Sequence, residues 1–478
     1  MKAKARRWPV IAGWLMAVII WGLGSGCLAE TPAGQNLTVD QAVQIAMTNS
    51  LQRRLAQGDV QTAREKVAQA ASAYGPQVTL SGAYNHLNNP PDIVTVGRGL
   101  AQLNNGLDQL ADILAAGSPA NPYLQAAAAQ LQREELPDDG LNYYGLQVNL
   151  VQPLYTGNKL TAANKQARAN QENAEANLSA AENSLVLEVK KAYYTVLFTQ
   201  RLAVTMDEAV ASMQHHLAEA NAYYKAGMVP RLDVMRAEVK LADLQQKQLL
   251  AQNSLNLAKS ALNFVLGVDL NMVYVLEDRM SAGPLPGDLP SCQAQALANR
   301  PELAAIGAKV EMARQAVSIA RSGKKPTVAL VLDGHKIEPN NEEPSLTIGV
   351  VATMKVYDHG MVDHQVAEAQ SVLEQAVTGQ QLLERGVKLE VEQAYRNAAA
   401  TLATIQVAEK SLAQAQETLR MAEISYQAGL STSLERIDAE VGLTQAKTNY
   451  SQALSTYNIA LAQLDRAMGM GKGKEGFR

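Results

Sequence analysis

Residues 187–239, LEVKKAYYTVLFTQRLAVTMDEAVASMQHHLAEANAYYKAGMVPRLDVMRAEV, recur in recognisable form 202 positions later, at residues 389–441. The matching positions are Leu187-Glu188-Val189 with Leu389-Glu390-Val391, Ala192-Tyr193 with Ala394-Tyr395, Tyr224 with Tyr426, Gly227 with Gly429, and Ala237-Glu238-Val239 with Ala439-Glu440-Val441. Self-similarity at a fixed spacing indicates a structural unit that is built twice. The 478-residue chain is therefore predicted to fold as two repeats.

A second pair of similar blocks lies upstream of these. Residues 49–76 align with residues 299–326 at a spacing of 250. Because the two spacings are 250 and 202, the first repeat holds 48 extra residues, which fall between about His86 and Gly140. The predicted division is a first repeat at 30–289 with an insert at about 86–140, a second repeat at 290–470, and a C-terminal tail at 471–478.

Most of each repeat has the pattern of long helices. A helix of about 35 residues comes first, and a proline-free stretch of about 70 residues and a returning helix of about 38 follow; 70 residues span about 105 Å. One continuous helix beside two shorter ones stacked end to end fits these lengths. The predicted ranges are 37–74, 158–226 and 232–268 in the first repeat and 291–323, 361–428 and 432–468 in the second.

Between the first and second helices of each repeat, apolar and polar residues alternate as in β-strands. The strands are predicted at 78–84 and 144–150 and at 328–333 and 346–353. This pattern fits the strands of an outer-membrane barrel and also a half-buried soluble hairpin. The insert is then the long loop of the first hairpin, either shielding one mouth of a barrel or without a role of its own. Tyrosines that suit a membrane interface lie near the strand ends: Tyr84, Tyr143, Tyr144, Tyr155 and Tyr357.

Four strands cannot close a barrel and leave two edges unpaired. Three chains supply twelve strands and twelve helical rods, which close both a barrel and a cylinder continuous with it. The sequence therefore predicts a mainly α fold with a small transmembrane β-barrel: long antiparallel coiled-coil helices plus four strands per chain, assembled as a homotrimer around a helical tunnel.

The N-terminus, residues 1–29, is typical of a secretory signal peptide. Basic residues precede an apolar run at 10–23 that is too short to span a bilayer. Two processing sites compete: cleavage after Ala29, and a lipobox at 24–27 that would leave Cys27 as a lipidated N-terminus. Either way Cys292 has no intramolecular disulfide partner. Beyond the leader no stretch approaches 18 consecutive apolar residues.

Composition and charge argue against other classes of protein. A net charge of −4 gives no basic excess for binding nucleic acid. Aromatic residues make up only 5% of the chain, which suits long helices better than an ordinary enzyme. The six histidines lack the spacing of a zinc helix, and no nucleophile elbow or Walker sequence is present. We expect no enzyme activity, no metal site and no cofactor.

In the order and duplicate spacing of its motifs, the chain resembles the TolC-like outer-membrane efflux proteins over nearly all of the predicted mature sequence. The motifs are Leu37-Thr38-Val39-Asp40-Gln41-Ala42, Gln152-Pro153-Leu154-Tyr155-Thr156-Gly157, Val356-Tyr357-Asp358-His359-Gly360, Tyr224-Lys225-Ala226-Gly227 and Tyr426-Gln427-Ala428-Gly429. The resemblance implies the outer membrane as location, with the helical part in the periplasm, and a homotrimeric, passive exit duct of a tripartite efflux pump or type I secretion system. It also implies partners: outer-membrane lipid, a periplasmic adaptor (membrane fusion) protein, and an inner-membrane pump or ABC exporter.

The same resemblance assigns roles at the periplasmic tip, where the long helices turn. It implies adaptor contacts at Gly227, Leu232, Gly429 and Leu434, and a pore aperture and gate formed by Glu435, Asp438, Asp233 and Tyr426. Where some members carry an arginine that latches the closed tip, this chain has Ser431. We expect a hydrogen bond between Tyr426 and Asp233 to take that part. As alternatives, Glu435 and Asp438 are merely solvated or pair with Arg436.

The main competing interpretation is a periplasmic coiled-coil adaptor or structural rod that never enters the membrane. Adaptors of that kind carry one helical hairpin with sheet-rich flanking domains, whereas this chain has a duplicated hairpin. The four alternating strands discriminate between the two interpretations.

Overall fold

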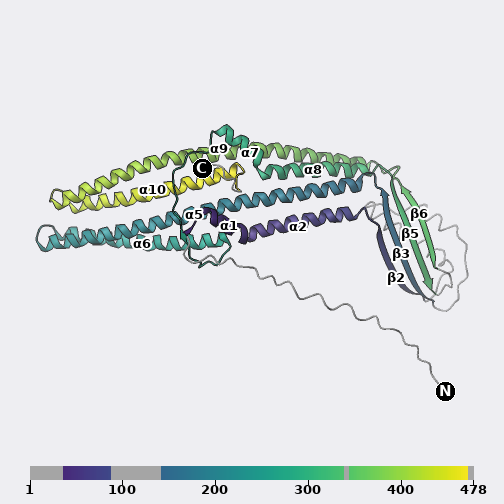
Figure 1. The fold of residues 1–478 in the computed structure, drawn as a ribbon, viewed down its shortest axis with the longest axis horizontal. Coiled ribbons are helices and arrows are strands. Elements are labelled where there is room, and N and C mark those ends of the chain that lie inside the picture. Colours follow the sequence, from purple (N-terminus) through teal and green to yellow (C-terminus); the bar gives the residue numbers. More distant parts are fainter. Residues whose placement is uncertain (1–35, 88–140, 339–343, 472–478) are drawn as a thin grey trace, which may run out of the picture.

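The computed structural model describes residues 36–87, 141–338 and 344–471. These residues form an elongated molecule in which the helices run along one axis and a sheet bends away at one end (Figure 1). Four predicted features lie outside the described residues: the signal peptide, the alternative lipidation site at Cys27, nearly all of the insert at 86–140, and all but the first residue of the tail.

The helices confirm the expected arrangement of rods. The two long helices, α5 and α9, have 67 residues each, about 100 Å at 1.5 Å per residue. Helices α2 and α6 pack along α5, and α8 and α10 pack along α9. Contacts of α5 with α8 and α10 join the two repeats. The helix bounds are α1 Val39–Asn49, α2 Leu51–Ser72, α5 Lys159–Lys225, α6 Arg231–Leu266, α7 Leu289–Asn299, α8 Pro301–Ser322, α9 Met361–Gln427 and α10 Ser433–Ala467.

The first predicted helix of each repeat is wrong in one respect, because each is two helices. The break falls at Ser50 in the first repeat and at Arg300 in the second, positions that the 250-residue spacing relates. Both residues are extended in ψ, at 124° and 122°. Pro301 disfavours helical backbone at Arg300, whereas the Ser50 hydroxyl accepts a hydrogen bond from Arg53 N and so caps α2.

The four expected strands form one antiparallel sheet in the order β2-β3-β5-β6. Each hairpin pairs its own strands, and β3 pairs with β5 across the two repeats, with an irregularity between Pro153 and Tyr155. A two-stranded parallel pair, β1 with β4, was not predicted. The strand bounds are β1 Asn36–Leu37, β2 Gln77–Leu87, β3 Leu141–Tyr155, β4 Val275–Leu276, β5 Thr327–Glu338 and β6 Ser345–Thr353.

The main core lies midway along the rods, where α1, α5, α6 and α10 meet. Tyr193 and Tyr457 are almost completely buried there. The Tyr193 hydroxyl donates hydrogen bonds to the carbonyls of Leu37 and Glu277, at 2.7 and 2.8 Å. It therefore ties the β1–β4 pair to α5. Many of the other buried residues on the rods are alanine, which lets helices approach closely.

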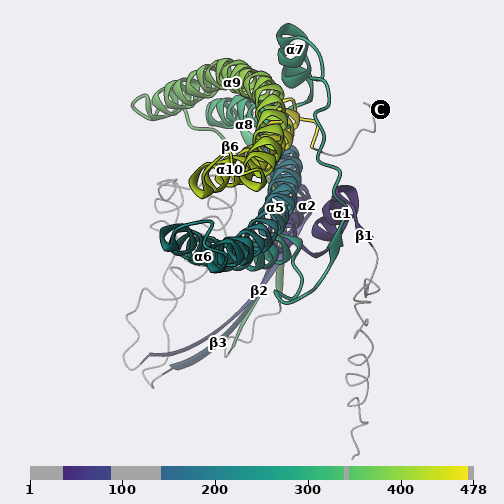
Figure 2. The ribbon, with the colours of Figure 1, turned by 90° about the vertical axis from the view of Figure 1, so that its left-hand side faces the viewer.

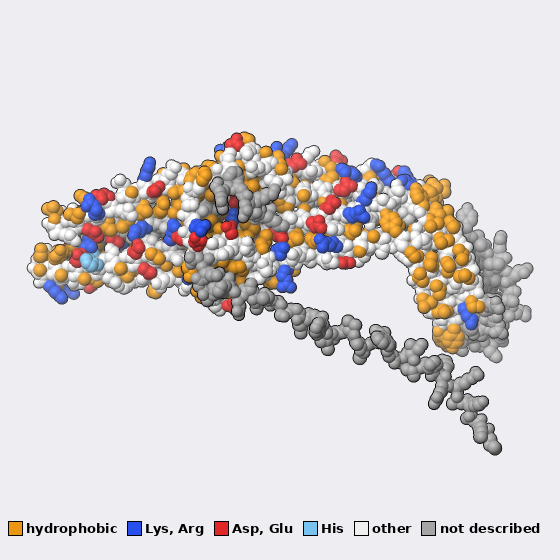
Figure 3. Space-filling view, viewed as in Figure 1, with side chains coloured by type: hydrophobic (Ala, Val, Ile, Leu, Met, Phe, Trp, Pro, Cys, Tyr) orange, Lys and Arg blue, Asp and Glu red, His pale blue; other side chains and the backbone are white. Residues whose placement is uncertain are grey.

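The two faces of the sheet differ sharply in chemistry. Large apolar side chains stand exposed on one face, and Figure 3 shows hydrophobic side chains over most of the visible sheet. They are Val78, Leu80, Tyr84, Tyr144, Leu146, Val148, Leu346, Ile348 and Val350. The alternate positions, on the opposite face, are mostly small or polar. Within the described residues, no helix combines the length and apolar character needed to cross a bilayer.

Candidate functional site: the paired helical tips

Each long helix ends in a tight turn that only glycine adopts easily. Gly227 has φ +75° and Gly429 has φ +71°. In the first turn Met228 N donates to the Tyr223 carbonyl at 2.8 Å, and Leu430 N donates to the Ser425 carbonyl at the same distance in the second. This is the pattern of a Schellman helix end. A Cβ on either glycine would meet nothing within 4 Å, so the requirement is one of backbone conformation alone.

The helices that return from the two turns begin differently. Helix α10 starts with a capping box, in which the Thr432 hydroxyl accepts from Glu435 N and the Glu435 carboxylate accepts from Thr432 N at 3.2 Å. Helix α6 follows Pro230, which makes no side-chain cap. Glu435 therefore stabilises the start of α10 while its side chain remains exposed.

Of the eight predicted tip residues, six are exposed, Asp233 is partly buried and Tyr426 is buried. Gly227, Gly429, Leu232, Leu434, Glu435 and Asp438 are all exposed. Met228 and Leu430, which directly follow the two glycines, are more exposed than either predicted leucine, at 72% and 84%. Sequence reasoning missed this apolar pair, although its position after the paired glycines is visible in the repeat.

Tyr426 and Asp233 come near each other but do not form the expected hydrogen bond, so that expectation is wrong. The Tyr426 hydroxyl is buried without a hydrogen-bond partner among the described residues. Asp233 instead lies 3.6 Å from the Arg236 guanidinium, one turn further along α6. Burial and the nearby Asp233 carboxylate raise the pKa of Tyr426.

A buried polar network joins the two hairpins beneath the turns. The Arg436 side chain, on α10, is only 6% exposed and forms an ion pair with Glu219 of α5. It also lies 3.8 Å from the Glu423 carboxylate of α9 and 5.7 Å from the centre of the Tyr426 ring. Arg436 therefore pairs with Glu219 and Glu423, and not with Glu435 or Asp438 as the alternative interpretation expected.

His216 is the second member of the network from α5. Its Nε2 lies 2.9 Å from the Ser433 hydroxyl of α10, and its ring meets Tyr426 edge to face at 5.3 Å. Burial and the neighbouring Arg436 charge lower the pKa of His216 to about 4. The imidazole is therefore neutral at neutral pH. One turn below, Glu440 accepts a hydrogen bond from the Ser212 hydroxyl, and burial raises the pKa of Glu440.

Sequence reasoning missed His216, although a signal was present. Ala209, Met213, His216 and Ala220 are buried at alternating spacings of four, three and four, the spacing of a coiled-coil seam. A histidine on such a seam faces another helix. Since no partner helix was assigned from the sequence, the contact with Ser433 was not foreseen.

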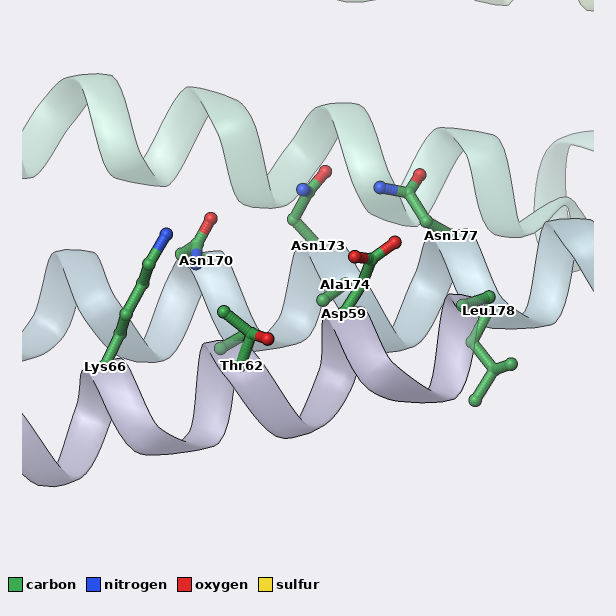
Figure 4. A pocket seen from close by; sticks show the side chains of 10 residues that line it. Asp59, Thr62, Lys66, Asn170, Asn173, Ala174, Asn177 and Leu178 are labelled. Atoms are coloured by element: carbon green, nitrogen blue, oxygen red, sulfur yellow. The ribbon is translucent and has the colours of Figure 1, made fainter. Parts of the chain in front are cut away.

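A second candidate site, a pocket lined mainly by polar side chains, lies away from the tips. It has a volume of about 260 Å³ and lies between α2 and α5 (Figure 4). Asp59, Thr62 and Lys66 line it from α2, and Asn170, Asn173 and Asn177 line it from one face of α5. It contains no histidine or cysteine. Among the described residues no three acidic, histidine or cysteine side chains are grouped so as to hold a metal ion.

Comparison with known proteins agrees with the fold and with the paired tips. A family model described as outer membrane efflux protein matches residues 42–268 and 293–470. Outer membrane protein TolC of Vibrio cholerae is 25% identical over 338 residues, which cover 67% of this chain and 76% of that protein. Outer membrane efflux protein BepC of Brucella suis is 22% identical over 454 residues, which cover 93% and 88%.

Solved structures support the same conclusion at the level of fold. The outer membrane protein VceC of Vibrio cholerae superimposes with a TM-score of 0.70 at 18% identity, covering 90% of this chain and 96% of that one. CusC superimposes with a TM-score of 0.72 at 17% identity, covering 92% and 95%. Since the family model spans both repeats and both tips, the chain belongs to the outer membrane efflux protein family, as an outer-membrane channel whose helical part lies in the periplasm.

Proposed function

We propose that this chain is one of three identical subunits of a passive exit duct, gated at its helical tips. The observation that carries the proposal is the sheet. Among the described residues its four strands leave β2 and β6 as unpaired edges, and one of its faces is apolar and exposed. Unpaired strand edges are costly in lipid. Pairing β2 of one copy with β6 of the next removes every edge when three copies close a twelve-stranded ring.

The dimensions of the sheet suit a bilayer. Tyr144 lies near one end of the apolar face and Tyr155 at the other, both exposed. The eleven steps between them span about 36 Å along the strand, or about 28 Å along the membrane normal at a tilt of about 40°. Exposed Tyr84 pairs with Tyr144 in register, and exposed Tyr357 follows β6. Tyrosines at both ends of an apolar band suit the two membrane interfaces.

The helices also leave surfaces that a second copy fits. Figure 2 shows an open arc with α6 and α9 at its two ends. Each carries large exposed apolar side chains: Val239, Leu257 and Phe264 on α6, and Leu382, Leu389 and Val407 on α9. The α6 edge of one copy packed against the α9 edge of the next would cover both rows and close the arc into a tunnel.

The exposed turns supply the surface for a partner. Four large apolar side chains are exposed at the ends of the two hairpins: Met228, Leu232, Leu430 and Leu434. We assign them to contact with a periplasmic adaptor that links the duct to an inner-membrane pump or ABC exporter. Relatives include a cobalt-zinc-cadmium resistance protein, CzcC of Cupriavidus metallidurans, and an alkaline protease secretion protein, AprF of Pseudomonas aeruginosa. Cargo is therefore set by the partner, and the duct itself is passive.

The exposed carboxylates at the tip of α10 are the proposed aperture of the pore. Glu435 and Asp438 are exposed one turn apart on α10, and three copies would bring six carboxylates around one axis. Rings of carboxylates favour cations over anions.

The test is single-channel recording from detergent-extracted protein in planar bilayers, with the oligomer mass measured in parallel. We expect a trimer, cation-selective conductance steps, and weaker selectivity in a Glu435→Ala, Asp438→Ala double variant. Steps that are unchanged in the double variant would remove these residues from the aperture and leave the duct. A folded protein that needs no detergent and conducts nothing would favour the periplasmic rod.

A further inference from the structure

The face of the sheet opposite the apolar surface carries very little charge. Within the described strands, no alternate position on that face holds an acidic or basic side chain, except Asp333 and His335 on β5. Register places Asp333 between Asn149 of β3 and Thr347 of β6, and His335 between Gln147 and Ser345. Asp333 is thus the one carboxylate on this face of the described sheet.

Neighbouring side chains hold the Asp333 carboxylate in place. The Gln147 amide donates a hydrogen bond to Oδ2 at 2.7 Å, and His335 Nδ1 lies 3.4 Å from Oδ1. The side chains of Asp333 and His335 remain 15% and 33% exposed. The carboxylate is therefore fixed against the wall and still reaches solvent.

We propose that Asp333, held by Gln147 and His335, is a cation-selectivity residue in the lumen of the sheet, separate from the acidic tip. The inference rests on the proposed trimeric duct, in which the polar face of the sheet lines the lumen. Three copies then form a ring of carboxylates that attracts small hydrated cations and disfavours anions.

Dimensions decide how strong this ring is. Twelve strands about 4.8 Å apart, tilted by about 40°, close at a backbone radius of about 12 Å. The carboxylates then lie about 10 Å from the axis, roughly one Debye length at 0.1 M salt. Three such charges in water change the cation-to-anion permeability ratio about fivefold at 0.1 M and about twentyfold at 0.01 M. The ring should act clearly only at low salt.

The experiment measures reversal potentials in a KCl gradient at low and moderate salt. Asp333→Asn is made in the wild type and in the Glu435→Ala, Asp438→Ala background, so that the tip carboxylates do not mask the result. We expect Asp333→Asn to lower cation preference in both backgrounds, with the larger effect at about 0.01 M, and Asp333→Glu to retain it.

Two control variants separate the ring from general effects. Asp288→Asn removes the same charge from the N-cap of α7, which Figure 2 shows standing off the arc, and asparagine caps equally well. It should leave selectivity unchanged. His335→Gln should preserve the cation preference, because the carboxylate remains. A loss in His335→Gln as large as in Asp333→Asn, or no change in Asp333→Asn at low salt, would overturn the inference. A folded trimer without any conductance would overturn the duct itself.

Discussion

At the scale of single residues, buried polar groups beneath the turns connect the two hairpins. His216 is 2% exposed and neutral, in contact with Ser433 and Tyr426. The charges of Arg436, Glu219 and His215 act on it electrostatically. Its pKa of about 4 lies below the ordinary value of 6.5. The unfolded chain therefore takes up a proton first as the pH falls.

This difference in pKa makes the folded state less stable in acid. Stability from the neutral imidazole is fully present above about pH 6.5 and is lost as the pH falls toward 4, by up to about 3 kcal/mol. Glu440, whose pKa is raised, contributes the opposite trend. The test therefore compares the change in melting temperature of each variant with that of the wild type. We expect His216→Gln to lose less melting temperature between about pH 7 and pH 4.5 than the wild type, by circular dichroism in detergent. His215→Gln changes a side chain that is 71% exposed and should behave as the wild type. Equal losses of melting temperature in the wild type and both variants would show that His216 does not cause the acid sensitivity.

Arg436 provides a second prediction at this scale. Arg436→Met removes the buried side of an ion pair and leaves Glu219 with only the exposed His215 nearby, at 3.7 Å, a change expected to cost about 1.5–3 kcal/mol. We expect the two hairpins to separate more easily, seen as faster proteolysis near residues 226–232 and as more frequent wide openings in single-channel records. Arg420→Met breaks only an exposed pair with Glu417 on α9 and should change neither. Matching behaviour of the two variants would contradict the role of the buried pair.

At the scale of elements, the two turns between the long helices require glycine because of their left-handed backbone conformation and not because space is short. Alanine at Gly227 or Gly429 has free space but must adopt the left-handed conformation, at about 1–2 kcal/mol per turn. Gly58, in the exposed middle of α2, likewise leaves open space for a Cβ, and its φ is not left-handed. There alanine should stabilise by up to about 1 kcal/mol. Thermal unfolding temperatures should fall in the two turn variants and rise in Gly58→Ala; a loss of stability in Gly58→Ala would count against this account.

The break between α7 and α8 is held by charge as well as by proline. Arg300, whose side chain is 3% exposed, reaches Glu390 of α9 at 2.6 Å and Glu302 at 3.4 Å. Arg466 of α10 binds the same two carboxylates, and the two guanidinium groups lower the pKa of Glu390 against the opposing effect of its burial.

We expect Arg300→Ala to destabilise the fold by about 1.5–3 kcal/mol, because the charge-assisted hydrogen bond of a buried guanidinium is lost while Arg466 still holds the two carboxylates. Chemical denaturation in detergent measures the change. Arg279→Ala, at a side chain 79% exposed, is the comparison and should stay within about 0.5 kcal/mol of wild type. A similar small effect at Arg300 would mean that Pro301 alone maintains the break.

For the whole molecule, the duplication made most of the architecture predictable. The paired glycines predicted the turns, and the helix lengths predicted two short helices stacked beside one long one. The alternation of apolar and polar residues predicted the four strands of the large sheet but not the short β1–β4 pair. The breaks at Ser50 and Arg300 were missed because apolar spacing continues through them, and the break depends on a cap in one case and on a neighbouring proline in the other. The tip network was missed because contacts between α5 and α10 join residues more than 200 apart, such as His216 and Ser433.

The pairing of β3 with β5 also has a consequence for how the chain matures. Gln147 and Asp333 are 186 residues apart, whereas each strand hairpin and each helical hairpin is completed within its own repeat. Contacts so distant in sequence form slowly. During export, the N-terminal repeat can therefore collapse while its partner is still being delivered, and it waits with the edge of β3 uncovered. We therefore expect the chain to be most prone to aggregation, and most dependent on a chaperone, before the second repeat arrives.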